Sequence, residues 1–205
     1  KEYLKDDVED LSVIEDAAIL IIKNGLHNLC NIDNKEMLKE QLSFEWDKHY
    51  WDTRRKKVLN KIARHNLCYG DKSQEPDYEN KLGRIIALSN APNLKKWKDS
   101  LETFFGPKAS NLELEGNLYY NIKNCGIGFH GDGERKKVIA CSLGKSRPIV
   151  WQYYYKYTAI GKRIEVLLED GDMYIMSEKA SGFDWKKKNL YTIRHAAGEK
   201  YVNKK

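Results

Sequence analysis

A histidine and an aspartate stand two residues apart at His130 and Asp132, in the stretch GFHGD. This stretch closes a predicted strand, and alternate side chains of a strand lie on the same face. The imidazole and the carboxylate therefore point the same way. Together they are two of the three ligands of a facial triad, which binds Fe(II) and leaves positions open for oxygen chemistry. The same spacing also fits a polar turn in which the histidine only makes hydrogen bonds.

A second histidine is needed to complete such a triad, and it must come from a different strand. His195 is the other histidine of the second half of the chain, and it ends a predicted strand over 190–195 (LYTIRH). Gly131 and Gly133 flank Asp132 and leave backbone room at a crowded site. The sequence thus predicts a metal site made by His130, Asp132 and His195.

The second half of the chain must hold these ligands, and it reads as short β-rich runs separated by Gly, Asp and Lys. The run EDGD at 169–172 predicts a hairpin between two of them. Many short strands with few helices are typical of a sandwich or a jelly roll. The predicted strands cover 117–120, 127–132, 137–143, 149–155, 163–168, 173–176 and 190–195.

The first half mixes charged and apolar residues at helical spacing. A helix is predicted over 34–62, where apolar residues recur every three or four positions. A second helix is predicted from NAPNLKKWKDSLETFFGP, in which Pro92 suits the first turn and Gly106 ends the helix. The segment DAAILIIKNGL at 16–26 fits either a strand or a buried helix. The whole chain is therefore predicted to be α+β.

The 205 residues carry 36 Lys and Arg against 30 Asp and Glu, a formal net charge of +6. A moderately basic chain is compatible with a polyanionic partner such as nucleic acid, but charge alone does not identify one. The four cysteines form no CxxC pair and are expected to be reduced thiols of an intracellular protein, in the cytoplasm or the nucleus. The longest apolar run, at 17–22, is too short to span a bilayer, so no membrane partner is expected.

Four motifs, taken in order, carry a resemblance to a known family. GFHGD contains the His-x-Asp pair, VIACSLG resembles the strand after it, LLEDGDMYIM resembles a Leu-x-x-Gly-Asp-x-x-x-Met segment, and RHAAG supplies His195. The chain over 64–205 thereby resembles the AlkB-like branch of the 2-oxoglutarate and Fe(II)-dependent dioxygenases. The resemblance implies that His130, Asp132 and His195 bind Fe(II).

The resemblance also implies a fold. The family has a double-stranded β-helix (jelly-roll) core, here expected with N-terminal helices packed on it. Residues 1–63 would form an N-terminal helical extension, and residues 64–205 would form the dioxygenase domain. The helix predicted over 34–62 has no clear counterpart in the family.

The resemblance further indicates where 2-oxoglutarate would bind. The segment NLYYN matches an Asn-x-Tyr motif that contacts the cosubstrate, which carries to Asn117 and Tyr119. The family normally adds two arginines after the distal histidine, but here AAGEKYVNKK follows without an arginine. A lysine can serve as a point charge instead, and a tight turn at Gly198 would place lysines of this tail on the face of His195. The candidate anchors are Lys200, Lys204, Arg147 and Lys145.

The activity that the resemblance implies is oxidation of a base in DNA or RNA, by demethylation or hydroxylation, with O₂ consumed and succinate and CO₂ released. A base in a duplex must be flipped into a pocket, which aromatic and basic side chains assist. RHNLCYGD followed by Tyr78 resembles a stretch of AlkB-like proteins. The runs WQYYYKY and SEKASGFDWKKK mix aromatic residues with lysines, as stacking surfaces do. The predicted substrate contacts are Arg64, Tyr69, Asp71, Tyr78 and Trp185.

Two other functions fit the same residues. The lysine-bearing tail after His195 favours a dioxygenase that hydroxylates prolyl or lysyl side chains of a protein substrate with the same cofactors. The intact triad argues against a jelly-roll binding module without catalytic activity, but the missing arginines leave that function open. Succinate release with methylated oligonucleotides or with peptides would separate the first two functions.

Overall fold

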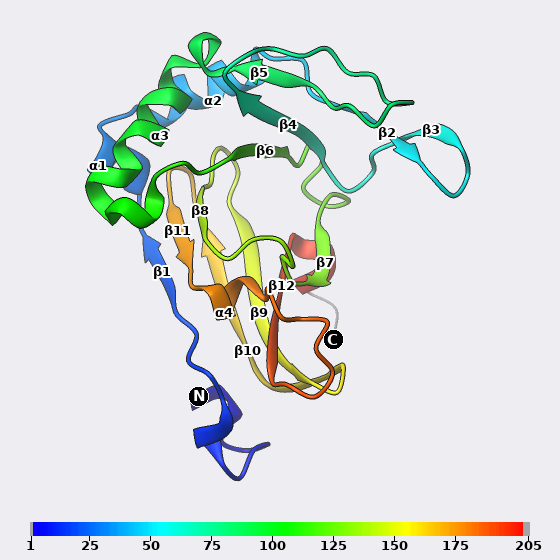
Figure 1. The fold of residues 1–205 in the computed structure, drawn as a ribbon. Coiled ribbons are helices and arrows are strands. Elements are labelled where there is room, and N and C mark those ends of the chain that lie inside the picture. Colours follow the sequence, from blue (N-terminus) through cyan, green and yellow to red (C-terminus); the bar gives the residue numbers. More distant parts are fainter. Residues whose placement is uncertain (1, 203–205) are drawn as a thin grey trace. The chain divides into compact units, whose positions relative to one another are not determined.

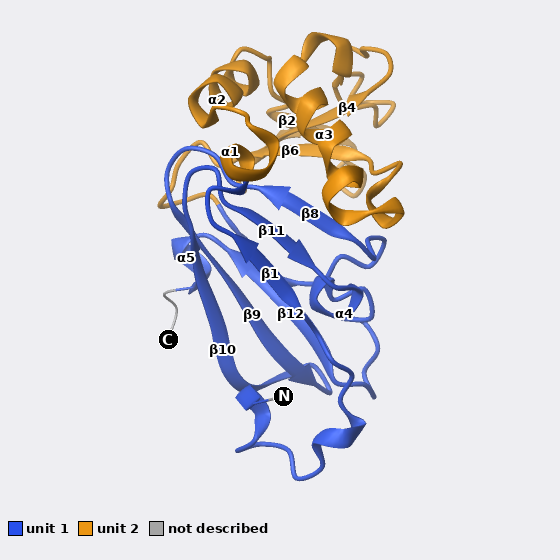
Figure 2. Ribbon diagram, turned by 90° about the vertical axis from the view of Figure 1, so that its left-hand side faces the viewer, with its two compact units in different colours: residues 1–25, 126–205 blue, residues 26–125 orange. Residues whose placement is uncertain are grey.

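The computed structural model describes residues 2–202. The chain divides into two compact units: unit 1 joins Lys1–Gly25 to Gly126–Lys205, and unit 2 is Leu26–Cys125 (Figure 2). Unit 2 is therefore an insertion between two parts of unit 1. This division does not follow the predicted boundary between residues 63 and 64. The division arises from long-range strand pairing, because residues 19–22 pair with residues 173–176 across the inserted unit 2 in the sequence.

Unit 1 consists mainly of strands. They are β1 (Ile19–Ile22), β7 (Ile127–His130), β8 (Val138–Cys141), β9 (Arg147–Tyr155), β10 (Thr158–Leu168), β11 (Met173–Met176) and β12 (Thr192–Ala197). Two short helices, α4 (Glu178–Ser181) and α5 (Glu199–Val202), and 3-10 turns at Glu2–Leu4 and Leu11–Val13 accompany them. The strands form two antiparallel sheets, in the orders β10-β9-β12-β7 and β1-β11-β8 (Figure 1). Each of the six strands predicted between 127 and 195 is present; β11 has the predicted ends, and the ends of the other five differ from the predicted ones.

The two sheets of unit 1 share one apolar core. Trp151 and Ile193 reach it from the larger sheet and Met176 from the smaller one. The indole Nε1 of Trp151 donates to the sulfur of Met176 at 3.3 Å, and both side chains are buried. On the opposite face of the larger sheet, Val150 and Ala196 pack against α5. Both faces of β9 and β12 are therefore covered, which explains their nearly continuous apolar character.

The turn at 169–172 does not form the predicted hairpin. β10 pairs with β9, whereas β11 pairs with β1 and β8, so the turn carries the chain from one sheet to the other. Asp172, 1% exposed, holds this turn by accepting hydrogen bonds from the backbone N–H groups of Glu169 and Asn24 and from Lys23 Nζ. The hairpin prediction was wrong because turn residues indicate a change of direction, but not the partner of each arm.

Unit 2 mixes helices with two small sheets. Its elements are α1 (Gly25–Cys30), α2 (Asn34–Leu42), β2 (His49–Asp52), β3 (Lys57–Asn60), β4 (His65–Gly70), β5 (Ile85–Ala87), α3 (Pro92–Phe105) and β6 (Leu114–Leu118), with 3-10 turns at Leu88–Asn90 and Pro107–Ala109. β2 pairs with β3, and β4 lies between β5 and β6. The chain is thus α+β, as predicted. Within residues 2–202, no helix has both the length and the apolar character needed to cross a bilayer.

The helix predicted over 34–62 is wrong beyond α2, which ends at Leu42. The following residues form the β2–β3 hairpin, in which Trp51 pairs with Val58. Its turn is closed by the Asp52 carboxylate, which accepts from the N–H of Arg55 at 2.7 Å. Aromatic and β-branched residues favour strands, and short apolar runs fit both periods. The sequence after Leu42 fits a helix and a strand about equally well, and the polar turn at Asp52 therefore determines that a hairpin forms.

The helix predicted from Pro92 is confirmed as α3, with its apolar stripe buried. Ala91 at its N-cap offers no side-chain acceptor. Glu40 of α2 caps the helix instead. Its carboxylate accepts hydrogen bonds from the backbone N–H groups of Asn93 at 2.7 Å and Leu94 at 3.0 Å. The start of α3 is thus stabilised by a residue that is distant in the sequence.

Candidate metal centre

β7 and β12 are neighbours in the larger sheet, and they bring the two predicted histidine ligands together. His195 pairs directly with His130 across the antiparallel strands. Residues directly opposite each other in such a pair share a face of the sheet. The centroids of the two imidazole rings lie 4.5 Å apart. Strand register alone therefore accounts for the meeting of these side chains.

Asp132 joins the two histidines from the turn that follows β7. The Nε2 atom of His130 lies 3.8 Å from Asp132 Oδ1, and the Nε2 atom of His195 lies 3.8 Å from Oδ2. One ligand atom from each of the three side chains lies within 4.8 Å of the other two. These distances are too long for hydrogen bonds. The three side chains lie near enough to one another that they could hold a metal ion.

A backbone carbonyl sets the tautomer of His130. Its Nδ1 atom lies 2.8 Å from the oxygen of Gly128, which can only accept, so Nδ1 carries the proton. The lone pair on Nε2 is then directed toward Asp132. Histidines that bind metals usually donate their second ring N–H in this way. The structure thus holds His130 in the form that a metal ion requires.

His195 is the more buried of the two histidines, with a side chain 9% exposed. Burial, and then the positive charges of His130 and Arg135, lower the pKa of His195 to about 3. The imidazole is therefore neutral at pH 7, which is the form that donates a lone pair. Its Nδ1 atom is buried and has no hydrogen-bond partner among residues 2–202. Two neutral imidazole nitrogens and one carboxylate oxygen are the donor set of a facial triad.

The loop that carries Asp132 is tied to α4. The backbone N–H of Asp132 donates to the oxygen of Ser181 at 2.9 Å, and the Ser181 hydroxyl donates to the oxygen of Arg135 at 2.9 Å. Lys179 and Asp184 form an ion pair at 2.7 Å with side chains 4% and 2% exposed. Loss of either partner would leave a buried charge, so this pair keeps the segment in place. The sequence did not predict these contacts, since local patterns carry no signal for them.

Two glycines approach each other closely behind the ligands. A Cβ atom on Gly131 would lie 2.1 Å from the backbone oxygen of Gly182 and 2.7 Å from the side chain of Trp185. Gly182 has a φ of 73°, and its own Cβ would lie 2.3 Å from the oxygen of Ile193. At Gly133 the nearest atom is Trp185 Nε1 at 3.7 Å, an ordinary contact. The predicted need for backbone room therefore holds at Gly131 and does not extend to Gly133.

Arg147 lies at the start of β9 and is half-buried. His195 pairs with Trp151 of the same strand. Arg147 precedes Trp151 by four positions, so strand alternation places Arg147, Trp151 and His195 on the inner face. Lys145, just before the strand, is exposed. Of these two candidate anchors for 2-oxoglutarate, Arg147 shares a face of the sheet with His195.

The chain after His195 does not continue as a strand beyond Gly198. β12 ends at Ala197, and the backbone N–H groups of Tyr201 and Val202 donate back to the oxygen of Gly198 to form α5. Strand alternation therefore no longer places Lys200 with His195, because the chain turns into a helix. Lys200 is exposed on that helix. The other predicted lysine, Lys204, lies outside the described residues.

Asn117 on β6, with Tyr119 just after it, belongs to unit 2, whereas the triad belongs to unit 1. Asn117 Oδ1 accepts hydrogen bonds from Arg64 Nε and, at 2.7 Å, from Asn66 Nδ2. Arg64 and Lys61 also line a groove of about 520 Å³ within unit 2. The parts that Asn117 and Tyr119 take in cosubstrate binding stay predictions.

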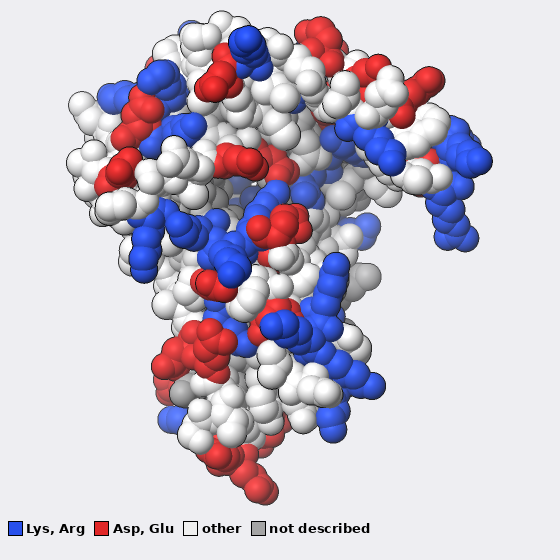
Figure 3. Space-filling view, viewed as in Figure 1, with Lys and Arg blue, Asp and Glu red and all other residues white. Residues whose placement is uncertain are grey.

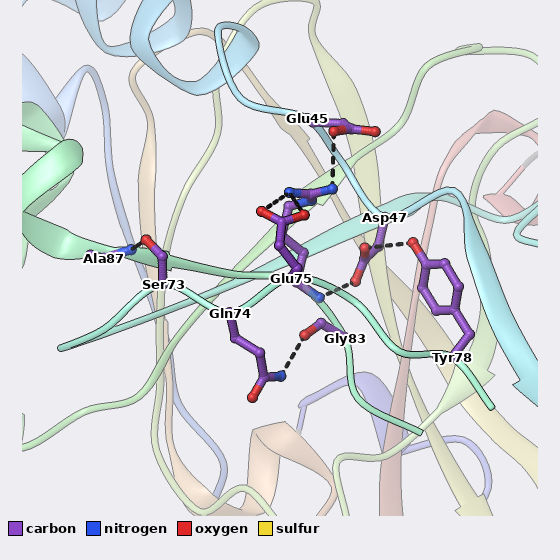
Figure 4. A network of polar contacts seen from close by, with 9 residues as sticks. Glu45, Asp47, Ser73, Gln74, Glu75, Tyr78, Gly83 and Ala87 are labelled. Atoms are coloured by element: carbon purple, nitrogen blue, oxygen red, sulfur yellow. Dashed lines mark hydrogen bonds and ion pairs between the residues drawn. The ribbon is translucent and has the colours of Figure 1, made fainter. Parts of the chain in front are cut away.

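Two of the predicted substrate contacts are tied into hydrogen bonds within unit 2. Tyr69 is buried, its hydroxyl donates to Gln41 Oε1, and burial raises the pKa of its phenol. Tyr78 donates to Asp47 Oδ1 at 2.8 Å, as Figure 4 shows. Burial and this carboxylate raise the pKa of Tyr78 to about 12. Both phenols therefore stay protonated at physiological pH and support the local fold.

Asp47 lies at the centre of this polar network. It also accepts from the backbone N–H of Arg84 at 2.7 Å, and the Arg84 guanidinium forms ion pairs with Glu75 at 2.8 Å and Glu45 at 2.9 Å (Figure 4). Asp71, another predicted substrate contact, is exposed after β4. The structure therefore gives this region a visible structural role, and its substrate role stays a prediction.

Trp185 is the predicted substrate contact that lies beside the triad. Its side chain covers the backbone of Gly131, the residue between two of the ligands. The guanidinium of Arg194, the neighbour of His195, lies 5.3 Å from the centroid of the Trp185 ring. The indole is thus in contact with residues next to the metal ligands on both strands.

Comparison with known proteins adds one relative. No family model matches the chain. Over 187 residues the chain is 42% identical to the uncharacterized protein R156 of Acanthamoeba polyphaga mimivirus, an alignment that covers 91% of the chain and 72% of R156. The chain belongs to the R156 family. Since each unit is about half of the chain, the shared region of the R156 family includes most of both units.

Proposed function

We propose that this chain is a 2-oxoglutarate- and Fe(II)-dependent dioxygenase of the AlkB-like type that oxidises a base in nucleic acid. The observation that carries the proposal is the convergence of His130, Asp132 and His195, with each imidazole Nε2 atom 3.8 Å from the shared carboxylate. In this proposal the two sheets of unit 1 are the two sides of a double-stranded β-helix, and the triad stands on its β7–β12 strand pair.

The chain has a defined part in this chemistry. Fe(II), when bound, would supply the redox chemistry, in which 2-oxoglutarate is decarboxylated to succinate while one oxygen atom of O₂ goes to the substrate. His130, Asp132 and His195 would hold the ion, and two histidines with one carboxylate are the ligand set that leaves positions open for oxygen chemistry. The oxygen of Gly128 accepts from Nδ1 of His130 and so makes Nε2 the metal-binding atom. Burial keeps His195 neutral, which is the form that binds a metal. Ser181 holds the loop that presents Asp132.

We assign the anchor of the cosubstrate carboxylate to Arg147. It shares the inner face of the larger sheet with His195, and apolar side chains such as Trp151 and Ile149 cover that face. A guanidinium binds a carboxylate through two parallel hydrogen bonds, whereas a lysine provides a point charge. Arg147 would therefore replace the arginines that the tail after His195 lacks.

The first test is anaerobic addition of Fe(II) and 2-oxoglutarate to the purified chain. We expect a visible charge-transfer band and Mn(II) binding at one ion per chain. The variants His130→Ala and Asp132→Ala should lose the band and bind Mn(II) roughly 100-fold more weakly or worse. His49→Ala, which removes an exposed histidine of unit 2, is the matched control and should behave as the unaltered chain. Equal Mn(II) affinity in all four proteins would contradict the proposal.

The second test concerns the substrate. Succinate release is measured with methylated single-stranded DNA and RNA oligonucleotides, and with peptides that contain proline and lysine. We expect stimulation by an oligonucleotide and loss of that stimulation in His195→Ala. Stimulation by peptides alone would keep the dioxygenase and remove nucleic acid as its substrate.

A further inference from the structure

Three loops of unit 1 carry most of its clustered lysines, and together they form the basic aromatic surface. The loops are 133–137 (GERKK) after the metal ligand Asp132, 155–157 (YKY) at the β9–β10 turn, and 183–188 (FDWKKK) between α4 and β12. Seven of their cationic residues are exposed: Arg135, Lys136, Lys137, Lys156, Lys186, Lys187 and Lys188.

Hydrogen bonds join these loops into one surface. The hydroxyl of Tyr157 donates to the backbone oxygen of Lys186 at 3.0 Å, and the backbone N–H of Lys156 donates to the oxygen of Lys188 at 3.2 Å. Lys136 Nζ lies 5.7 Å from the centroid of the ring at 183. Figure 3 shows Lys and Arg side chains gathered at the lower right, over the loop that joins α4 to β12. Segments that are distant in the sequence thus present their charges together.

The three loops hold seven basic residues and two acidic ones, Glu134 and Asp184. Asp184 is buried in its ion pair with Lys179, so it does not face the lysines of its own loop. Glu134 is exposed, and Glu178 of α4 lies 3.5 Å from Lys136. The excess of positive charge in these loops suits the surface to a polyanion.

Aromatic rings lie among the cations. Tyr157 is 54% exposed. It lies at the β9–β10 turn, and its backbone has a φ of 66°, a conformation that bulky residues rarely adopt. Lys186 Nζ lies 5.7 Å from the centroid of the Trp185 ring, and Lys187 Nζ lies 5.8 Å from that of Phe183. An open ring stacks on a base while neighbouring cations contact phosphates. A nucleic-acid strand therefore uses both the charges and the rings of this surface.

This surface begins at the metal centre. Asp132 directly precedes the first loop, and Trp185 of the third loop covers Gly131. Arg194, next to the ligand His195, lies 4.2 Å from the ring centroid of Tyr154 and 5.7 Å from that of Tyr157. A chain of aromatic and cationic contacts therefore runs from the ligands to the exposed turn.

We propose that the basic aromatic surface binds single-stranded nucleic acid, with its lysines on the phosphates and Tyr157 stacked on a base. The inference rests on the proposed function, because a nucleic-acid substrate is the reason for a single strand of DNA or RNA to bind beside the metal centre. Its test uses the chain without metal, so binding is measured apart from chemistry.

The experiment is fluorescence anisotropy with labelled 15-nucleotide DNA and RNA single strands of mixed sequence, in EDTA, between 50 and 200 mM KCl. The variant Lys186→Gln/Lys187→Gln/Lys188→Gln should bind at least about tenfold more weakly at 50 mM KCl. Because each phosphate contact to a single strand contributes about 0.7 to the slope of log affinity against log salt, the slope should fall by about 2. All three side chains are exposed, so an unchanged thermal transition is expected.

The matched control removes the same charge elsewhere. Lys35→Gln/Lys39→Gln/Lys95→Gln changes three exposed lysines on α2 and α3. We expect it to keep the affinity within about twofold. Equal losses in the two triple variants would overturn the proposal, because net charge and not this surface would then explain binding.

A single substitution separates stacking from charge. Tyr157→Leu removes the ring and should weaken binding about tenfold. Tyr157→Phe keeps the ring without the hydroxyl and should restore most of the affinity. Equal affinities of the Leu variant and the unaltered chain would overturn the stacking part.

The remaining outcomes identify other partners. Binding of phosphatidylserine vesicles or of polyglutamate, without binding of the oligonucleotides, would overturn the proposal in favour of a lipid or a protein surface. Oligonucleotide binding by a chain that fails to bind Mn(II) would refute the proposed function and support this inference. Mn(II) binding without oligonucleotide binding would do the reverse.

Discussion

The two units of the molecule differ in what holds their secondary structure. In unit 1 both faces of β9 and β12 are covered, and two apolar clusters hold the strands. In unit 2 the elements depend on polar contacts between distant residues, such as Glu40 at the start of α3 and Asp47 between Tyr78 and Arg84. Apolar patterns are visible in a sequence, whereas a distant polar partner is not.

The difference also concerns the site. In unit 1, register and a close backbone approach bring together three side chains that the sequence singled out. In unit 2, the predicted contacts Arg64, Tyr69 and Tyr78 bond to neighbours within the unit. The motifs of unit 1 therefore named residues that meet in one place, whereas those of unit 2 named residues with separate partners within that unit. Five substitutions test this contrast.

The largest effect is expected at the close approach behind the ligands. Gly131→Ala places a methyl group 2.1 Å from the backbone oxygen of Gly182, which belongs to the turn that ends α4. We expect a loss of about 3 kcal/mol in the free energy of unfolding, measured with urea, and loss of Mn(II) binding. Gly133→Ala is the matched control, with a loss below about 0.5 kcal/mol. Equal stabilities of the two variants would show that the backbones of Gly131 and Gly182 have room for a methyl group between them.

A buried carboxylate in each unit provides the second comparison. Asp172→Asn in unit 1 removes the charge that three donors share, and should cost about 2 kcal/mol of unfolding free energy. Asp47→Asn in unit 2 should cost a similar amount, because Tyr78 and the backbone of Arg84 lose a charged acceptor. Urea denaturation measures both. A loss in one variant only would show that one of the units does not depend on its buried carboxylate.

A pH test applies to Asp172, because the direction of its pKa shift gives the sign of the effect. Burial alone would raise the pKa of Asp172, but hydrogen bonds from Lys23, Glu169 and Asn24 together hold it below its ordinary value. The folded carboxylate thus contributes stability that is fully present above about pH 4, the unfolded value, and is lost as pH falls through the folded pKa. The gap between the unaltered chain and Asp172→Asn should therefore narrow below about pH 4. A gap that is constant down to pH 2 would contradict this account.

A third effect tests the inner face of unit 1. Arg147→Ala should raise the KM for 2-oxoglutarate about tenfold or more, since a bidentate carboxylate contact is lost. Lys145→Ala, which changes an exposed neighbour, should leave it within about twofold. Succinate release at varied 2-oxoglutarate measures both. A larger effect of the lysine than of the arginine would move the anchor to the loop before β9.

The smallest effect concerns the polar cap of unit 2. Glu40→Gln keeps the shape of the side chain but removes the negative charge at the start of α3. We expect a loss of about 1 kcal/mol in unfolding free energy. Glu36→Gln, in the first turn of α2, is the matched control on the same helix. Indistinguishable variants would mean that α3 does not need its distant cap.

The sequence by itself determined the α+β class, six of the seven strands of unit 1, helix α3 and the three residues that meet as His130, Asp132 and His195. Each of these rests on a local signal: an alternating or helical apolar period, or the spacing of two polar side chains. The closeness of His130 and Asp132 could be predicted because residues two apart in an extended segment share a face, although β7 ends at His130 and Asp132 lies in the turn that follows.

The tertiary structure decided what no local signal carries. The register of β7 and β12 placed His195 opposite His130. Strand pairing made the segment 169–172, which was expected to form a hairpin, a connection between two sheets. The turn at Asp52 formed a hairpin within the helix predicted over 34–62. Three loops met to form the basic aromatic surface. The physical reason is the same in each case: these features depend on hydrogen bonds and contacts between residues that are distant in the sequence, and their energies arise only when the chain has folded.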